Sequence, residues 1–401
     1  MKKNIWILNH YASNGIGRHY KFAQNLTKRG YNVKIFAAST IHNSNKNRIN
    51  DSRKYIEEIE DTISCVYIRA RNYKGNGKDR ILNMIDYAYG LLSVSKKFDS
   101  EKPDIIYASS VHPLTWLSGY ILSKRYDAKF IAETRDLWPE TLVAMGQIKK
   151  NSIPAKLLYK LEKFIYKKAD RLIFTFPGGK DYVEEIGLDP SKVRYINNGV
   201  DLEEYNYNKE KYQYADEDLD DNSTFKILYT GSMGQANELS YLLEAAKIIQ
   251  DKGVKNIKFI LFGDGYQRKG LEQFAKDNNL QNVIFKGKVE KKYIPSILSR
   301  SDLNVFTGKH IYLYKYGLSL NKMFDYFASG KPILSNIECG YDLLEKYNCG
   351  ETVKGGSSES LAEGILRFYN MPKEEYNIYC KNVSIPAPSG QPSRRIRALI
   401  L

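Results

Sequence analysis

Short apolar runs alternate with amphipathic helical segments along most of this chain, and this alternation constrains the fold more than any other feature. The first 40 residues are the clearest example, because Ile5–Leu8 is predicted as a strand, a helix ending near Gly30 follows, and Val33–Ala38 is predicted as a second strand. Such a unit buries its helix when the two strands run parallel in one sheet. We therefore expect an α/β protein whose doubly wound parallel sheets carry helices on both faces.

The alternation occurs in two series, and a polar, acidic segment separates them. In the first series, later strands are predicted at Cys65–Ile68, Ile105–Ala108, Lys129–Ala132, Leu172–Phe176 and Arg194–Ile196. In the second series, strands are predicted at Lys226–Tyr229, Lys258–Phe262, Val283–Phe285, Asn304–Phe306 and Ile333–Leu334, with helices at Leu239–Gln250 and Lys269–Asn278. Because 401 residues exceed one typical core, we predict a domain over 1–200, an acidic linker over 201–224, a second domain over 225–380 and a Pro-rich tail over 381–401.

Composition narrows the partners of the chain. Its 61 Lys and Arg exceed its 46 Asp and Glu, and the net charge of +15 predicts an anionic partner. There is no zinc-finger spacing, no RNP-like string and no uninterrupted basic tract, so we do not expect nucleic acid. No apolar run reaches the length of a membrane span, and four scattered cysteines are typical of a reduced cytosolic protein. We expect a cytoplasmic protein that works beside the anionic inner face of the cell membrane.

The basic stretch Pro154–Arg171 has two interpretations. It places Leu157, Leu161, Phe164 and Ile165 on one face of a predicted helix. We expect this helix to be buried in the first domain, and contact with lipid is the alternative.

One segment of the second domain combines the groups that a nucleotide ligand requires. Ser319 is predicted to cap a short helix, Asn321 and Lys322 lie in its first turn, and Asp325 follows about one turn later. Backbone N–H groups and a lysine at a helix N-terminus suit a phosphate, and the carboxylate suits a pair of ribose hydroxyls. The alternative is an ordinary helix–strand unit with a surface lysine. Gly330 and Pro332 are predicted to end the helix.

Polar and Gly-rich segments follow several predicted strands, and ligands bind at such strand ends in open α/β sheets. In the first domain these segments contain Gly15, Gly17 and Arg18, then His112, then Glu133, Arg135 and Asp136. In the second domain they contain Gly231 and Ser232, then Gly263, Asp264 and Gly265, then Val289, and finally Lys309 and Lys315. Each has a plain structural alternative: a tight turn, a buried histidine or a salt-bridged turn. Tyrosine at position 20 replaces the third glycine of a dinucleotide-binding fingerprint, which disfavours that function.

The string from Ser319 to Pro332 resembles the donor-binding motif of retaining glycosyltransferases of family 4, which have the GT-B fold. It is most similar to the branch of bacterial N-acetylfucosamine transferases of surface polysaccharide synthesis. Asp325 matches the second acidic position of that motif, whereas Gly317 stands at the first. The family also often places an arginine and a lysine after the glycine-rich loop of its second domain, where this chain has Gln235–Leu239.

The resemblance implies two doubly wound domains facing a cleft and a role for each residue above. His112, Glu133, Arg135 and Asp136 are expected at the active site, and the others at the donor. The implied reaction transfers an N-acetylated hexosamine or 6-deoxyhexosamine, with retention, from a UDP-sugar to a polyprenyl-diphosphate-linked saccharide in O-antigen or capsule synthesis. No metal and no cofactor are expected. A GT-B-like epimerase or phosphorylase and a non-catalytic sugar-nucleotide-binding protein are the alternatives.

Overall fold

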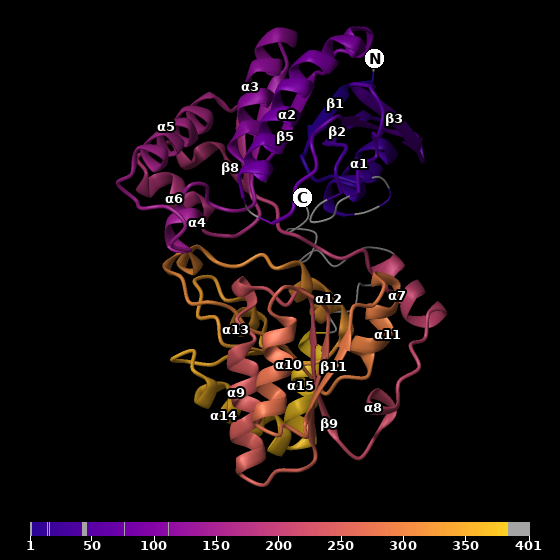
Figure 1. Ribbon diagram of the computed structural model, residues 1–401, viewed down its shortest axis with the longest axis vertical. Coiled ribbons are helices and arrows are strands. Elements are labelled where there is room, and N and C mark those ends of the chain that lie inside the picture. The colour runs from indigo at the N-terminus through magenta and orange to yellow at the C-terminus, as the bar shows by residue number, and fades with distance from the viewer. Residues whose placement is uncertain are drawn as a thin grey trace. The chain divides into compact units, whose positions relative to one another are not determined.

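The computed structural model describes residues 2–383 apart from residues 14, 16, 42–45, 76 and 111, and its ribbon is drawn in Figure 1. The chain divides into two compact units, Met1–Ile196 and Asn197–Leu401. Each unit is built around one sheet, and helices connect its strands. The predicted tail lies outside the described residues from residue 384 onward.

The first unit contains a sheet of eight strands in the order β3-β4-β2-β1-β5-β6-β7-β8. Their bounds are β1 (Asn4–Leu8), β2 (Asn32–Ala38), β3 (Tyr55–Glu60), β4 (Ile63–Ile68), β5 (Ile105–Ser109), β6 (Lys129–Thr134), β7 (Arg171–Phe174) and β8 (Val193–Tyr195). All pairs are parallel except β3 with β4, which form a hairpin. The predicted parallel sheet is therefore confirmed, and β3 is an edge strand that the sequence did not indicate.

Six α-helices lie among the described residues of the first unit: α1 (Arg18–Lys28), α2 (Lys78–Val94), α3 (Pro113–Tyr126), α4 (Glu140–Ala144), α5 (Ile153–Lys168) and α6 (Gly179–Glu185). Two 3₁₀ turns accompany them, η1 (Ser95–Glu101) and η2 (Pro190–Lys192). Helix α3 packs against α2 on one side and α5 on the other (Figure 1). Gly119 permits its close approach to the sheet, because a Cβ there would lie 2.7 Å from the Ala108 Cβ.

The second unit contains a wholly parallel sheet in the order β11-β10-β9-β12-β13-β14. Its strands are β9 (Phe225–Thr230), β10 (Ile257–Phe262), β11 (Val283–Gly287), β12 (Leu303–Phe306), β13 (Ile333–Ser335) and β14 (Gly350–Thr352). Its described helices are α7 (Leu202–Lys211), α8 (Glu217–Asp220), α9 (Ser240–Asp251), α10 (Arg268–Asp277), α11 (Ile294–Ser299), α12 (Asn321–Ser329), α13 (Leu343–Tyr347), α14 (Ser358–Asn370) and α15 (Lys373–Val383), with 3₁₀ turns η3 (Gln235–Asn237), η4 (Lys291–Tyr293) and η5 (Tyr312–Tyr316). The second βα series is therefore confirmed.

The acidic segment after Asp201 is part of the second unit. It forms α7 and α8, and its carboxylates pair with cations on distant elements of the same unit. Lys286 Nζ lies 2.8 Å from Asp216 and 2.7 Å from Asp218, and Arg300 lies 2.7 Å from Asp220. These pairs hold the segment against the sheet, so it is not the free linker that its composition suggested.

The strand order of each sheet reverses direction at one place, between β1 and β5 in the first unit and between β9 and β12 in the second. At such a point the connections leave toward opposite sides, and a crevice opens beyond the carboxyl ends of the two strands. Among the residues singled out in the sequence, Gly15 follows β1, His112 follows β5, Gly231 follows β9 and Lys309 follows β12. The topology therefore identifies the two places where a ligand is expected.

Candidate functional site

Two glycine-rich loops pack backbone against backbone at the carboxyl edge of the second sheet. A Cβ on Gly263 would lie 1.7 Å from the carbonyl oxygen of Gly231, and one on Gly265 would lie 2.3 Å from that of Met233. The Gly231 N–H donates to Phe262 O at 2.9 Å, and the Met233 N–H donates to Asp264 O at 2.9 Å. Glycine is therefore required at 263 and 265 for packing, and this packing fixes the loop that follows β9.

The side chain of Lys322 lies against the loop that follows β9. Its Nζ donates to Tyr229 Oη and to Asn237 Oδ1, both at 2.7 Å, and lies 4.2 Å from the centroid of the Tyr229 ring. A Cβ on Gly231 would come within 3.0 Å of the same Nζ. Both hydrogen-bond partners are neutral, and desolvation lowers the pKa of the Lys322 ammonium to about 7. The arrangement holds a cation at the switch point with neutral acceptors alone.

Further bonds tie this lysine to both loops of the switch point. Tyr229 Oη donates onward to Ser232 O at 2.7 Å, and the Asn237 amide donates to Ser232 O and Oγ. Thr307, just after β12, donates to Asn237 O at 2.6 Å, and the Lys309 N–H donates to Ala236 O at 3.3 Å. The structure thus joins Gly231, Ser232, Lys309 and Lys322, four of the predicted donor-binding residues, in one constellation.

The N-terminus of α12 differs from the prediction. Leu320 is the N-cap residue, and no side chain caps the first turn. Ser319, the predicted cap, instead donates its hydroxyl to Asn197 Oδ1 at 2.5 Å, and the Asn198 amide donates to Ser319 O at 2.8 Å. The capping prediction is therefore wrong, because the side chains of 197 and 198 bind this serine. The Met323 N–H donates to Leu320 O at 3.2 Å. The N–H groups of Asn321 and Lys322, at the start of the helix, face no capping side chain and suit an anion.

Asp325 is half-buried on α12 below this terminus. Burial raises the pKa of its carboxyl, and the nearby Lys291 acts in the opposite direction. Burial, with a smaller contribution from the Asp325 carboxylate, raises the pKa of Tyr205, whose hydroxyl is buried without a hydrogen-bond partner among the described residues. Asp325 therefore lies in partly desolvated surroundings close to Tyr205 of α7.

Other predicted donor residues have different surroundings. Asp264 is exposed and accepts the N–H of Gly265 at 2.8 Å within its own turn. Val289 is half-buried and packs against the core of the second unit. Lys315 is exposed, with Nζ 4.7 Å from the centroid of the Tyr316 ring. Asn321 is the exposed first residue of α12.

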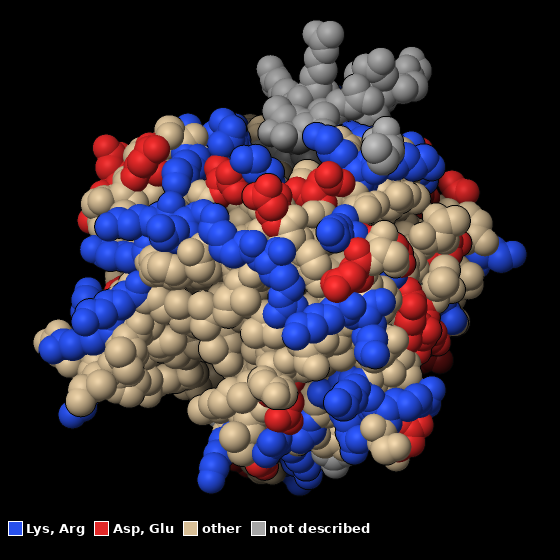
Figure 2. Space-filling view, turned by 90° about the horizontal axis from the view of Figure 1, so that it is seen from above, with Lys and Arg blue, Asp and Glu red and all other residues tan. Residues whose placement is uncertain are grey.

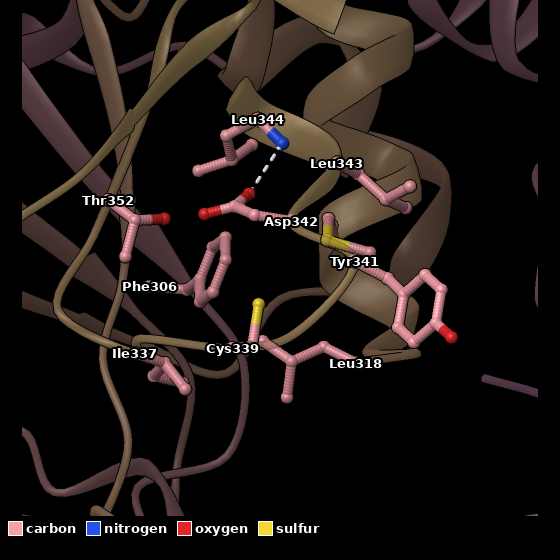
Figure 3. A pocket seen from close by; sticks show the side chains of 10 residues that line it. Phe306, Leu318, Ile337, Cys339, Tyr341, Asp342, Leu343, Leu344 and Thr352 are labelled. Atoms are coloured by element: carbon pink, nitrogen blue, oxygen red, sulfur yellow. Dashed lines mark hydrogen bonds between the residues drawn. The ribbon is translucent and has the colours of Figure 1, made fainter. Parts of the chain in front are cut away.

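A small cavity lies close to this site, and Figure 3 shows Phe306, Cys339, Asp342 and Thr352 around it. Its volume is about 10 Å³, which is space for one water molecule. The Asp342 carboxylate that faces it caps α13 by accepting the Leu344 N–H at 2.7 Å. This cavity is a packing defect and is too small for a sugar nucleotide.

In the first unit, Glu133 lies next to the end of β6 inside a hydrogen-bonded network. Its fully buried carboxylate accepts hydrogen bonds from Arg18 at 2.8 Å, from His19 Nε2 at 2.7 Å and from the Tyr107 hydroxyl at 2.7 Å. These partners hold the pKa of Glu133 well below its usual range, against the effect of burial. The sequence predicted an acceptor or active-site role for Glu133 and donor binding for Arg18. The structure places the two side chains in an ion pair.

A histidine pair bridges the ends of β1 and β5. His112 Nε2 lies 2.8 Å from His10 Nδ1, and His10 Nε2 lies 2.7 Å from Asn83 Oδ1. Burial lowers the pKa of His112 well below its usual value, so the ring is neutral. With the His10 Nε2–H donating to Asn83, the His112 Nε2–H donates to His10. The His112 Nδ1 is then a buried acceptor without a partner among the described residues.

The remaining first-unit predictions lie around these two networks. Arg135 is half-buried, and its backbone N–H donates to the Ser110 hydroxyl at 3.2 Å. The adjacent Asp136 is exposed. Gly15 and Gly17 both have positive φ, as a tight turn requires. A Cβ on Gly15 would lie 3.4 Å from the Glu60 carboxylate. A carboxylate beside this loop opposes a phosphate there.

Sequence reasoning missed His10, His19, Tyr229 and Asn237. The sequence signal for the two histidines was weak, because each is an isolated histidine in its segment. Their partners, His112 for His10 and Glu133 for His19, lie more than 100 positions away. Among the described residues, no three His, Cys, Asp or Glu side chains form a group that could hold a metal ion. Within the same part of the chain, no helix is both long and apolar enough to cross a bilayer.

Comparisons with known proteins agree with this architecture. Residues 13–204 match the model of Glycosyltransferase Family 4, and residues 224–371 match that of Glycosyl transferases group 1. The UDP-Gal:alpha-D-GlcNAc-diphosphoundecaprenol alpha-1,3-galactosyltransferase of Escherichia coli is 29% identical over 310 residues, covering 76% of this chain and 75% of the relative.

Two solved structures show the same fold. Sucrose-phosphate synthase from Thermosynechococcus elongatus aligns with a TM-score of 0.73 at 17% identity, over 100% of this chain and 95% of that one. WaaG, a glycosyltransferase involved in lipopolysaccharide biosynthesis, aligns with a TM-score of 0.65 at 13% identity, over 95% of this chain and 94% of WaaG.

Two parallel-sheet α/β domains with these structural neighbours define a protein of the GT-B fold. The chain carries a glycosyltransferase family 4 domain followed by a group 1 domain, and it is a glycosyltransferase.

Proposed function

We propose that this glycosyltransferase moves a sugar, with retention of configuration, from a UDP-sugar to a polyprenyl-diphosphate-linked saccharide. The observation that carries the proposal is Lys322, a partly desolvated cation held by neutral acceptors beside the open N-terminus of α12. Such a site suits an anion, and the diphosphate of a nucleotide sugar supplies negative charge to both the lysine and the helix N-terminus. No metal or cofactor is proposed, since the lysine and the helix stabilise the charge of departing UDP.

The comparisons support the substrate classes. The Escherichia coli relative is named for a UDP-sugar donor, a diphosphoundecaprenol-linked acceptor and an α-linked product. WaaG is named for lipopolysaccharide biosynthesis. We extend these classes to this chain and place it in O-antigen or capsule synthesis, at the inner face of the cell membrane. For the donor sugar, the resemblance of the Ser319–Pro332 string favours an N-acetylated hexosamine or 6-deoxyhexosamine.

The residues take distinct roles in this proposal. Lys322 and the first-turn N–H groups of α12 bind the diphosphate, and Asp325 accepts the ribose hydroxyls. His112 accepts a hydroxyl of the transferred sugar at Nδ1, the one ring nitrogen without a partner among the described residues. Glu133 positions Arg18 and His19, because all of its hydrogen bonds are made within the first unit. Arg135 and Asp136 are assigned to the acceptor, since they directly follow β6, the strand that contains Glu133.

The test is UDP release from a panel of UDP-hexoses and UDP-N-acetylhexosamines, with and without polyprenyl-linked saccharide. The wild type is compared with Lys322→Met and Asp325→Asn, and with Lys269→Met, which changes an exposed lysine on α10. We expect acceptor-dependent release that both site variants lose and the α10 variant keeps. Interconversion of UDP-sugars without an acceptor would indicate an epimerase. Tight UDP binding without turnover of any donor would indicate a binding protein.

A further inference from the structure

The positive charge of the chain is concentrated in one unit. Residues 1–196 contain 34 Lys and Arg against 20 Asp and Glu, whereas residues 197–401 contain 27 against 26. Figure 2 shows bands of Lys and Arg across one face of the molecule, with Asp and Glu in smaller groups. The positive excess that suggested an anionic partner therefore belongs to the first unit. In the second unit, the carboxylates around α8 form ion pairs with Lys286 and Arg300.

Helix α5 presents this excess together with apolar side chains. Ile153, Leu157 and Phe164 are 76%, 61% and 39% exposed, although a helix buried in the domain core was expected. The other exposed residues of α5 are Pro154 and the lysines Lys156, Lys160, Lys163, Lys167 and Lys168. Its one acidic residue, Glu162, points inward, where the Tyr182 hydroxyl donates to it at 2.9 Å. The outer side of α5 thus carries lysines and apolar groups without a carboxylate.

The neighbouring helices extend the same surface. On α2, the exposed side chains of Ile81, Ile85 and Tyr89 recur every fourth residue and form one stripe. Helix α3, which packs between α2 and α5, contains no Asp or Glu and exposes Ile121 with Lys124 and Arg125. Of the large hydrophobic side chains exposed in the described part of the first unit, most lie on these three helices. We call this surface, defined by the exposed residues named here, the α2–α3–α5 face.

We infer that the α2–α3–α5 face docks on an anionic lipid bilayer and holds the enzyme where its lipid-linked acceptor resides. The inference rests on the proposed acceptor, and the face supplies what an interfacial helix needs: apolar side chains that enter the headgroup boundary and lysines that meet acidic headgroups. A protein partner of ordinary composition would not match a surface whose exposed charges on α3 and α5 are all positive. Charge complementarity therefore selects the bilayer.

The experiment measures binding of the full chain to vesicles of phosphatidylcholine alone and with phosphatidylglycerol. We expect binding to the acidic vesicles that weakens with salt. Exchange of Lys156, Lys160 and Lys163 for Glu lowers the partition coefficient by about 100-fold or more, at roughly fivefold for each cation lost. Leu157→Asp lowers it as well. The matched controls exchange exposed residues of the second unit, Lys252, Lys269 and Lys276 for Glu and Ile378 for Asp, and leave binding unchanged.

Several outcomes would overturn the inference. Equal binding to neutral and acidic vesicles would contradict docking by the α2–α3–α5 face. An equal loss of vesicle binding in the control variant with Lys252, Lys269 and Lys276 changed to Glu would contradict it as well. Sedimentation showing a dimer that Leu157→Asp disperses would assign the face to a second copy instead. UDP-sugar affinity in solution is measured on every variant. If the wild type releases UDP in an acceptor-dependent way in detergent but binds no vesicles, the docking face alone is refuted. If the wild type binds no UDP-sugar, the proposed function is refuted.

Discussion

Replacing Lys322 by methionine is predicted to stabilise the free protein while it abolishes donor binding. The pKa of this lysine is lowered from 10.5 to about 7 in the folded protein. At 1.36 kcal/mol per pKa unit, burying the Lys322 ammonium costs about 4 kcal/mol of folding free energy at pH 7, where about half of the folded molecules already carry the neutral amine. The bonds to Tyr229 and Asn237 offset about 1 kcal/mol each. Methionine has a similar length and no charge, so the net gain is about 2 kcal/mol.

The sign of the pH dependence follows from the same shift. Between about pH 7 and 10.5 the unfolded lysine binds a proton that the folded one has lost, so wild-type stability rises with pH across this window. The advantage of Lys322→Met is therefore largest below pH 7 and shrinks as the pH approaches 10.5.

Scanning calorimetry at pH 6.5 and near pH 9.5 measures both effects. A gain of about 2 kcal/mol raises the transition of a unit of this size by about 4–8 °C, while Lys269→Met leaves it unchanged. Calorimetric titration with a UDP-sugar is expected to show an affinity loss of about 100-fold or more, because the desolvated charge pair is gone. A variant that melts lower than the wild type and still binds the donor normally would refute the reasoning.

Three further outcomes are expected. UDP-sugar affinity of the wild type falls by about tenfold per pH unit above pH 7, and titrations in buffers of different ionisation enthalpy show proton uptake, since the bound diphosphate keeps Lys322 protonated; a pH-independent affinity would contradict this. Glu133→Gln destabilises the first unit by about 3–5 kcal/mol in thermal unfolding, because Arg18 loses its buried counter-charge and His19 a charged hydrogen-bond acceptor, and an unchanged melting temperature would show that the network is dispensable. Gly263→Ala lowers both the melting temperature and donor affinity, since its Cβ would overlap Gly231 O, whereas Gly270→Ala on α10, which has open space, does neither.

The sequence predicted the buried strands well and the exposed ones poorly, for a physical reason. Parallel strands buried on both faces are continuous apolar runs. For this reason β1, β2, β9 and β10 can be predicted from the sequence alone. The edge strand β3 has the sequence Tyr-Ile-Glu-Glu-Ile-Glu, and none of its residues is fully buried, so it lacks the apolar run of a buried strand. The acidic segment was misjudged because composition reports charge and not the partners, which here stand up to 80 positions away.

The candidate site shows the same division. Residues whose role depends on local spacing were predicted, as with Lys322 and Asn321 at a helix start. Roles that depend on long-range contact were not. Ser319 was expected to cap α12, yet it binds Asn197, 122 positions away, and nothing local distinguishes the two outcomes. Likewise Arg18 and Glu133 each read as ligand-binding groups until the fold brings them together across 115 positions.

The two switch points differ most in how their cations are compensated, and this difference locates the anion. In the first unit Arg18 faces the fully ionised Glu133, and the glycine loop before α1 lies beside the Glu60 carboxylate, so a phosphate there would meet negative charge. In the described part of the second unit, Lys322 Nζ has as hydrogen-bond partners only the oxygens of Tyr229 and Asn237, and no side chain caps the adjacent helix start. A folded chain retains an uncompensated, partly desolvated ammonium at a cost in stability, and a ligand that supplies the missing charge recovers it. We therefore expect the diphosphate of the donor to bind at the switch point of the second unit.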